Sequence, residues 1–281
     1  MKKIFLSVDI EEWYHLDYFK NYKDVNKKIE TIPDIYNFLN VLDELNIKCT
    51  FFTLGESALK FPEIIKELSA KGHEIACHGL DHELLYNKSN ENFKYEVKKA
   101  KEILEDISPN IKIQGYRASC FSMDREKLDI LKEIGYSYDS SYISFAEHPL
   151  YGKLDMTGFT RSQSLIHKND HFYEFEIPTY KIGKYNIPIS GGGYLRLFPF
   201  WLNNYFIKDY LKKNENFIFY LHPFELTDKK IEFPKEAKKS EIFRASVGRK
   251  NNLKKLKKIL MSLKKDSVEF TTFSEEVTRN G

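Results

Sequence analysis

Strand and helix signals alternate along most of this chain, and this alternation limits the fold more than any other feature of the sequence. Short apolar runs predict buried strands, and segments with apolar residues at helical spacing follow them. The expected strands are 3–10, 49–54, 74–77, 111–116, 136–138, 172–178, 217–221 and 267–273, and the expected helices are 32–45, 62–70, 92–107, 125–134, 198–211 and 251–263. Because strands that alternate with helices form parallel sheets, we expect an α/β fold.

No Gly-, Pro- or Ser-rich tract divides the 281 residues. An α/β barrel needs about 250 residues, so we expect residues 1–281 to form one catalytic domain. The regular alternation fails at about 144–199, which we predict to be an insertion that shapes the substrate cleft. A flexible connector is the alternative. Within this region, Ser190-Gly-Gly-Gly-Tyr194 is expected to be a loop where the backbone can approach a ligand.

The net charge of +3 does not indicate a nucleic-acid partner, because Lys alternates with Asp and Glu on helices such as 92–106. Basic residues dominate only at 249–265, which we interpret as a surface helix. Contact with an anionic membrane or a substrate phosphate is the alternative for this helix.

The cysteines and the first residues of the chain indicate the cellular compartment in which we expect the protein. Cys49, Cys77 and Cys120 lie in or beside apolar strands and are expected to be reduced core thiols. The first apolar run is too short for a signal peptide, and no run approaches the roughly 18 residues of a membrane span. We therefore expect a cytoplasmic protein with at most peripheral membrane contact.

Residues that can bind a metal follow several of the expected strands. The cluster Asp9-Ile-Glu11-Glu12 ends the first strand, His78 and His82 follow the third, and His222 ends a later one. Two imidazoles and one carboxylate form a site for Zn²⁺ or a similar ion with one position left open, as catalytic sites require. Collected at the carboxyl ends of barrel strands, these residues indicate a metal hydrolase. For the histidine pair alone, a purely structural role is the alternative.

Five segments resemble the motifs of the polysaccharide deacetylase family, the NodB-homology group of carbohydrate esterases (family 4-like). They are Ser7-Val-Asp-Ile-Glu-Glu-Trp13, His78-Gly-Leu-Asp-His82, Gly115-Tyr-Arg-Ala-Ser-Cys-Phe-Ser122, Tyr138-Asp-Ser-Ser141 and Tyr220-Leu-His-Pro-Phe224. Ser190 to Arg196 and Phe243 to Leu256 are similar to a bacterial branch associated with surface and extracellular polysaccharide biosynthesis. The resemblance covers nearly the whole chain. It implies a distorted (β/α) barrel, usually with seven strands, that hydrolyses an N-acetyl group on an amino sugar.

The resemblance also implies a role for each matched residue. Asp9 corresponds to the catalytic base, Arg117 to the residue that holds this base through a bidentate contact, and His222 to the general acid. His78 and His82 correspond to ligands of a divalent metal ion, with Zn²⁺ as the expected cofactor.

Two positions differ from the usual motifs of the family. Where the family has adjacent aspartates, this chain has Asp9-Ile-Glu11-Glu12, and side chains two apart on a strand share a face. Glu11 is therefore the expected third ligand, with Glu12 as the alternative if the chain turns here. Ser119 replaces a common proline in the loop at 116–119, whose backbone N–H groups are expected to help to stabilise an oxyanion.

Further candidates for substrate contacts are Trp13, His15, Tyr116, Asp139 and Tyr194. Trp13 and His15 follow the first motif, where a core or capping role is the alternative. Asp139 is a candidate to orient His222, with a turn in Asp-Ser-Ser as the alternative.

Together these residues predict a metal-dependent N-deacetylase of an N-acetylated sugar, carried on a nucleotide or a lipid, in O-antigen, capsule or exopolysaccharide synthesis. An allantoinase-like amidohydrolase of a small amide is the alternative enzyme, because related barrels with an acidic-x-acidic first motif cleave such substrates. An inactive glycan-binding module is the alternative outside catalysis. Such a module needs neither Asp9 nor His222.

Overall fold

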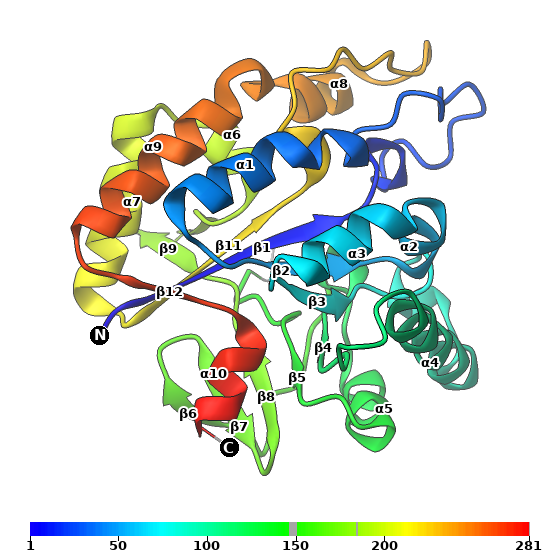
Figure 1. The fold of residues 1–281 in the computed structure, drawn as a ribbon, viewed down its shortest axis with the longest axis vertical. Helices are drawn as coiled ribbons and strands as arrows, with labels where there is room; N and C mark the ends of the chain where they lie inside the picture. The colour runs from blue at the N-terminus through cyan, green and yellow to red at the C-terminus, as the bar shows by residue number, and fades with distance from the viewer. Residues whose placement is uncertain (146–150, 184, 281) are drawn as a thin grey trace.

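A ten-stranded sheet organises the computed structural model, which describes residues 1–145, 151–183 and 185–280 (Figure 1). The strands of this sheet are β1 (Lys3–Ile10), β2 (Thr50–Thr53), β3 (Glu74–Cys77), β4 (Gly115–Tyr116), β5 (Tyr138–Asp139), β6 (Thr160–Gln163), β7 (Ile166–Asn169), β8 (Phe172–Phe175), β11 (Asn216–Leu221) and β12 (Glu269–Thr271). Seven of them lie side by side and parallel, in the order β11-β1-β2-β3-β4-β5-β8. β7 and β6 continue the β8 edge in antiparallel pairing, and β12 runs parallel to β1. A separate hairpin joins β9 (Thr179–Ile182) to β10 (Tyr185–Pro188).

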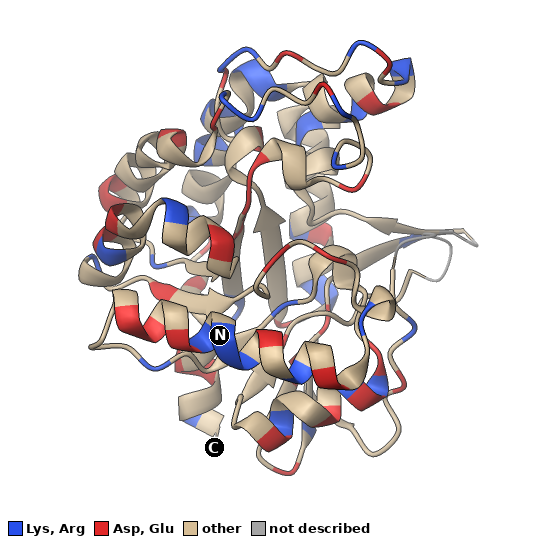
Figure 2. Ribbon diagram, turned by 90° about the vertical axis from the view of Figure 1, so that its right-hand side faces the viewer, with Lys and Arg blue, Asp and Glu red and all other residues tan. Residues whose placement is uncertain are grey.

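Ten α-helices are found in the described residues. They are α1 (Ile35–Leu45), α2 (Gly55–Lys60), α3 (Pro62–Ala70), α4 (Asn90–Ile107), α5 (Arg125–Ile134), α6 (Gly192–Leu197), α7 (Phe200–Lys213), α8 (Lys239–Ser246), α9 (Asn252–Lys265) and α10 (Phe273–Asn280). On the outer side of the strands, α7 contacts α9 and α9 contacts α1, while α3 contacts α4 and α4 contacts α5. Acidic and basic residues are mixed along the visible helices (Figure 2), as expected for solvated surfaces. Among the described residues, no helix combines the length and the apolar character needed to cross a membrane.

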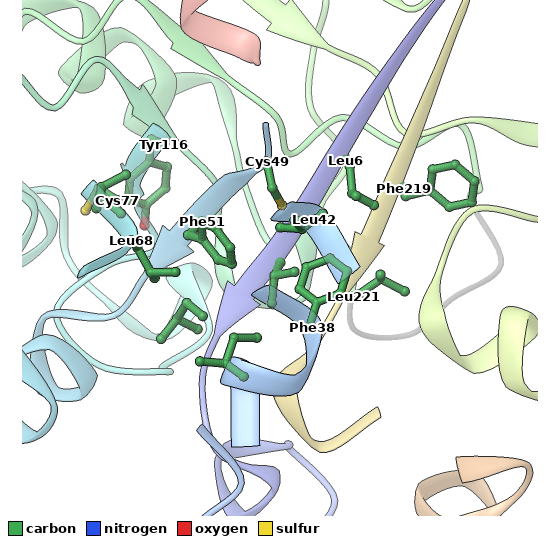
Figure 3. Close-up of a cluster of buried hydrophobic side chains, with 14 of the residues drawn as sticks. Leu6, Phe38, Leu42, Cys49, Phe51, Leu68, Cys77, Tyr116, Phe219 and Leu221 are labelled. Atoms are coloured by element: carbon green, nitrogen blue, oxygen red, sulfur yellow. The ribbon is translucent and has the colours of Figure 1, made fainter. Parts of the chain in front are cut away.

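Alternating side chains of β1 separate an outer core from the interior of the barrel. Ile4, Leu6 and Val8 are fully buried and belong to the larger core, which fills the space between the strands and the helices. Figure 3 shows part of this core, with Leu6 in the same cluster as Phe38 and Leu42 of α1. This burial fixes the register of β1 and therefore the direction of its inward residues.

The inward face of β1 carries Phe5, Ser7 and Asp9. Phe5 lies in a second, mainly aromatic core. Phe273, the first residue of α10, packs against Phe5 with ring centroids 5.2 Å apart and stacks on Tyr138 at 5.6 Å. Aromatic packing thus fills the interior near the amino ends of the strands, and the polar Ser7 and Asp9 lie nearer the carboxyl ends.

The parallel sheet with surrounding helices confirms the predicted α/β class. Seven parallel strands also agree with the number expected for a distorted (β/α) barrel. Within the described residues β8 does not pair with β11, so hydrogen bonds between strands do not close the barrel. Near this opening an isolated bridge joins Gly191 to Tyr220 of β11.

Region 144–199 contains more regular structure than the sequence predicted, although 146–150 and 184 lie outside the described residues. We expected one strand at 172–178, whereas the structure contains β6 to β10. Most side chains of β6 are exposed, so this strand lacks an alternating apolar pattern. The predicted loop at 190–194 is also wrong in part, because Gly192 begins α6.

Two other predicted strands are shorter in the structure. Pairing in the segment 111–116 is confined to Gly115–Tyr116, and the N–H of Ile113 donates to the Glu105 carboxylate at 3.0 Å instead of a neighbouring strand. The last strand ends at Thr271, because α10 begins at Phe273. The N–H of Thr272 donates to the Glu275 side chain at 3.1 Å, a capping contact that favours the helix.

Candidate active site

Four parallel strands deliver polar residues to one rim of the barrel. Asp9 is the last inward residue of β1, and Glu11 follows it. His78 comes directly after β3, Arg117 directly after β4, and His222 directly after β11. Since the carboxyl ends of parallel strands share one rim, residues far apart in the sequence meet there.

A buried ion pair joins Asp9 to Arg117. Arg117 Nη1 donates to Asp9 Oδ1 at 2.7 Å and to Ser7 Oγ at 2.8 Å. Arg117 Nε and Nη2 donate to the carbonyl and hydroxyl oxygens of Ser140, and the guanidinium lies 4.0 Å from the ring centroid of Phe52. The contact with Asp9 uses one nitrogen, so the expected bidentate geometry is wrong. Asp9 Oδ2 does not contact the guanidinium, and Asp9 lines the pocket described below.

Glu11, His78 and His82 each place one ligand atom near a common point. Glu11 Oε2 lies 2.8 Å from His82 Nε2 and 3.9 Å from His78 Nε2, and the ligand atoms all lie within 4.8 Å of one another. The side chains are buried, and the close contact between Glu11 Oε2 and His82 Nε2 does not have hydrogen-bond geometry, which leaves this oxygen unsatisfied. A buried carboxylate oxygen without a donor is costly, and a cation would satisfy it. The donor set and the unsatisfied oxygen therefore fit a divalent ion such as Zn²⁺.

His78 is held in the tautomer that a metal ligand requires. Its Nδ1 lies 2.8 Å from the Arg117 carbonyl oxygen, and because a carbonyl can only accept, Nδ1 carries the proton. Nε2 is therefore the atom with a free lone pair. Burial lowers the pKa of His78, which favours the neutral ring.

Glu11 is ionised in this environment. Burial by itself raises the pKa of the Glu11 carboxyl, but the imidazoles of His82, His222 and His78 outweigh this effect and hold the pKa far below its usual range. The same contact acts on His82, where burial lowers the pKa and Glu11 raises it by more. The cluster therefore offers a carboxylate beside two imidazoles, which matches the ligand chemistry of zinc.

His222 faces the same point from β11. Its Nε2 lies 3.5 Å from Glu11 Oε1 and 4.0 Å from Asp9 Oδ2. Its Nδ1 donates to Glu225 Oε2 at 3.0 Å, and Arg196 Nε donates to the other oxygen of Glu225 at 3.0 Å. Burial lowers the pKa of His222, but the carboxylates of Glu225, Glu11 and Asp9 together outweigh burial, and the pKa rises to about 9. His222 is thus held as a protonated ring beside the metal-ligand cluster.

Sequence reasoning missed Glu225 and Arg196. The Glu225 carboxylate accepts both the backbone N–H of His222 and its ring N–H, each at 3.0 Å. A glutamate three residues after a strand-end histidine has the spacing of a capping box, and that signal could have identified it. Asp139, the residue predicted to orient His222, is fully buried elsewhere and accepts from the Ser141 hydroxyl at 2.8 Å. The turn alternative for Asp139 agrees with this contact.

Glu12 points away from the ligand cluster. Its Oε2 accepts from the backbone N–H of Thr31 at 2.6 Å and from the Thr31 hydroxyl at 2.7 Å, and its Oε1 accepts from the N–H of Ile32 at 3.0 Å. Glu12 is therefore occupied in fixing a neighbouring loop. Glu11 lies on the metal side, which is the placement expected if the strand pattern of β1 continues past Asp9.

A pocket of about 440 Å³ opens above these residues. Asp9, Glu11 and the three site histidines line its floor, and aromatic residues such as Phe121, Phe224 and Phe243 contribute to its walls. Tyr194, which the sequence analysis named as a candidate for substrate contacts, also lines the pocket. Apolar walls with a few convergent polar groups are typical of small-molecule sites.

Trp13, His15 and Tyr116 do not line this pocket in the described part of the chain, so their substrate contacts stay predictions. Trp13 is fully buried in a separate aromatic cluster, and its Nε1 donates to the Ile29 carbonyl at 2.8 Å. His15 Nδ1 accepts from the N–H of Glu12 at 3.2 Å and so caps a short turn. Tyr116 belongs to the outer core (Figure 3). The contacts of Trp13 and His15 agree with the core and capping alternatives.

The loop after β4 differs from the predicted oxyanion loop. The N–H of Arg117 donates to the Cys77 carbonyl at 3.0 Å, and the N–H of Ala118 donates to the Ser141 hydroxyl at 2.8 Å. These two groups are therefore not free to stabilise an oxyanion. Both are used to hold β4 against its neighbours.

Cys120 was predicted to be a core thiol, but it lies in the wall of the pocket. Its backbone is in the left-handed region, with φ 50°, and its Sγ donates to Asp17 Oδ2 at 2.8 Å. Cys49 and Cys77 are buried thiols, as expected.

Two family models together match most of the chain. Residues 33–138 match the model described as polysaccharide deacetylase, and this range contains His78, His82 and Arg117. Over residues 33–138 the chain therefore matches the polysaccharide deacetylase family. Residues 140–278 match a second model, described as a domain of unknown function, DUF3473. This second range contains Arg196, His222 and Glu225.

Curated proteins named as deacetylases align with part of this chain. The chain is 37% identical over 79 residues to a peptidoglycan-N-acetylglucosamine deacetylase of Bacillus cereus, covering 27% of this chain and 29% of that protein. It is 28% identical over 95 residues to a chitooligosaccharide deacetylase of Azorhizobium caulinodans, covering 34% of this chain and 45% of that protein. The aligned part thus spans less than half of either relative.

The fold agrees with a solved structure of the family. A proposed polysaccharide deacetylase from Mycobacterium smegmatis superposes with a TM-score of 0.65 at 18% identity, covering 99% of this chain and 89% of that one. The comparison supports the barrel fold over the whole chain.

Removing the Glu11 carboxylate should abolish tight metal binding. Loss of an outer-shell partner already weakens metal affinity by about 10–100-fold, so Glu11→Ala should weaken Zn²⁺ affinity by at least about 100-fold. Glu12→Ala is the matched control, because this neighbouring carboxylate only fixes the 31–32 backbone. Competition with a fluorescent zinc chelator measures both variants. Wild-type affinity in Glu11→Ala, or a loss confined to Glu12→Ala, would move the ligand to Glu12.

Two adjacent glycines provide a test of the Glu225 contact. A Cβ at Gly192 would lie 1.7 Å from Glu225 Oε2, whereas a Cβ at Gly193 would meet nothing within 4 Å. Gly192→Ala should therefore displace Glu225 and lower the pKa of His222, while Gly193→Ala should leave it unchanged. Titration of the His222 ring protons by NMR in metal-free protein gives both values. Equal pKa values in the two variants would contradict the proposed role of Glu225.

Proposed function

We propose that this chain is a divalent-metal-dependent hydrolase that removes the N-acetyl group from an amino sugar. The observation that carries the proposal is the arrangement of two proton-transfer groups around one ligand cluster. Asp9 and His222 both face Glu11, His78 and His82, and each has its own charged partner, Arg117 for the base and Glu225 for the acid. A site that only held a metal or a glycan would need neither partner.

The chain's own residues divide the chemistry between them. A metal ion held by Glu11, His78 and His82 would activate water and polarise the acetamide carbonyl. Asp9, oriented by its ion pair with Arg117, accepts the proton of the attacking water. His222, kept protonated by Glu225, donates its proton to the departing amine. The reaction consumes water and releases acetate and the free amino sugar.

The proposed substrate is an N-acetylated sugar linked to a nucleotide or a lipid, deacetylated in the cytoplasm during synthesis of a surface polysaccharide. The names of the curated relatives, deacetylases of peptidoglycan N-acetylglucosamine and of chitooligosaccharides, support an amino-sugar substrate. The aromatic pocket walls provide surfaces on which a sugar ring can stack. The resemblance of 190–196 and 243–256 to a branch found with polysaccharide biosynthesis supports the biological setting.

Substitutions at the two proton-transfer groups should separate catalysis from metal binding. Asp9→Asn and His222→Ala should each retain Zn²⁺ and lower turnover by about 10²–10⁴-fold, the usual contribution of general acid–base catalysis. The wild type should show a bell-shaped pH profile, and His222→Ala should lose the alkaline limb, because protonated His222 is the active form. Acetate release from nucleotide-linked and lipid-linked N-acetyl sugars measures turnover, and elemental analysis measures the metal.

The control for these variants is Asp43→Asn, which changes a carboxylate on α1 that is paired only with a surface lysine. It should keep wild-type turnover. Circular dichroism checks that the Asp9→Asn variant, in which the guanidinium of Arg117 loses its charged partner, is folded. Turnover at the wild-type rate in both Asp9→Asn and His222→Ala would refute the mechanism.

A further inference from the structure

Apolar side chains are exposed beside the mouth of the pocket, at the junction of α6, α7 and α8. This rim patch consists of Leu197, Phe200, Trp201 and Phe243. Trp201 is 67% exposed, Phe243 56% and Leu197 49%. Soluble proteins rarely expose a group of large apolar side chains without a binding function.

The rim patch is continuous with the pocket. Leu197 and Phe243 both line the pocket and are exposed to solvent. Phe200 and Trp201 begin α7, which leads into β11 and therefore starts at the rim where the site residues lie. Lys255 Nζ donates to the carbonyls of Arg196 and Phe198, which ties this corner to α9. A ligand that enters the pocket on this side passes Leu197 and Phe243.

The segments that form this corner are mainly basic, although Glu241 in the first turn of α8 is acidic. No Asp or Glu occurs at 177–208 or at 242–265, and the second range contains nine Lys and Arg residues. Arg244, which lines the pocket, and Lys250, Lys254 and Lys258 are exposed. In the described residues, no hydrogen bond or ion pair occupies these four side chains. Basic side chains without partners next to exposed aromatic rings match the composition of membrane-surface segments.

We propose that the rim patch docks on the surface of an anionic lipid bilayer. Trp201, Phe200 and Phe243 enter the interfacial layer, where aromatic side chains are favoured, and the lysines of 250–258 contact acidic headgroups. The inference rests on the proposed function only in that substrate enters by this pocket. With the patch on the membrane, the pocket mouth faces the bilayer, so the substrate would be an N-acetyl sugar carried on a membrane lipid.

Charge favours a bilayer over a second copy of the chain as the occupant. A symmetric dimer through this patch would bring the basic residues of both copies together, and like charges oppose such an interface. An anionic surface neutralises the same residues. Light scattering tests for this dimer, which would have twice the mass of a single chain in solution. Such a dimer would also shield Trp201 from solvent when no lipid is present.

The chain contains a natural probe for this contact. It has two tryptophans, of which Trp13 is fully buried and Trp201 is largely exposed. Vesicles containing phosphatidylglycerol should shift the fluorescence of Trp201 to shorter wavelength and protect it from acrylamide, whereas phosphatidylcholine vesicles should have a much smaller effect. In Trp201→Phe this spectral change should disappear.

Sedimentation with vesicles tests the contribution of the basic residues beside the rim patch. Lys250→Glu combined with Lys254→Glu should weaken binding to phosphatidylglycerol vesicles by about tenfold or more, because each basic residue near an anionic surface adds to the attraction and each glutamate opposes it. Trp201→Glu should also weaken binding. Tyr95→Ser is the control, since Tyr95 is 69% exposed on the distant α4. None of these substitutions changes a pocket-lining residue, so turnover of a soluble N-acetyl sugar should stay at the wild-type level.

The outcomes separate this inference from the proposed function. Vesicle binding that depends on Trp201 and the lysines supports docking even if no acetate is released. Absence of binding to anionic vesicles, unchanged binding in the Lys250/Lys254 variant, or a dimer that hides Trp201 would each overturn the inference, whatever the activity of the enzyme.

Discussion

The buried guanidinium of Arg117 is the interaction on which the site depends. Its side chain binds Asp9, Ser7 and Ser140, and its carbonyl oxygen accepts the Nδ1 proton of His78. One residue therefore fixes both the proposed base and the tautomer of a proposed metal ligand. The charge is fully buried, so removal of a partner would leave it uncompensated at a cost of about 3–5 kcal/mol. Because Arg117 directly follows β4, the barrel itself sets the position of the base relative to the ligand cluster.

The two parts of the chain that match different family models contribute opposite sides of the site. His78, His82 and Arg117 come from the part that matches the deacetylase model, whereas His222, Glu225 and Arg196 come from the part that matches a domain of unknown function. In our account, the second part supplies the protonated acid, several walls of the pocket and the exposed rim. The reaction would need both parts, because the first supplies the ligands His78 and His82 and the second supplies the acid His222.

The sequence predicted best where residues lie inside regular strands. The alternation of side chains along β1 places Asp9 on the face opposite the outer core. The direction of the Glu11 side chain agrees with the same two-residue period. The period fails just after the strand, where a short turn at Trp13–His15 buries Trp13 and uses His15 as a cap. Arg196 was missed because its contact with Glu225 joins residues 29 apart through α6, and no sequence period indicates such a contact. β6 and the other short strands of 144–199 were missed for a related reason, since their pairing depends on neighbours rather than on their own apolar pattern.

The central claim is that Glu11, His78 and His82 share one divalent ion while Asp9 remains outside its ligand set. Anomalous diffraction at the zinc edge, from crystals grown with Zn²⁺, tests this claim most directly. Our account predicts a single strong peak in the pocket, within about 2.0–2.2 Å of Glu11 Oε2 and of Nε2 of both histidines. A peak coordinated by Asp9 or Glu12 in place of Glu11, or no peak between the two histidines, would contradict the account.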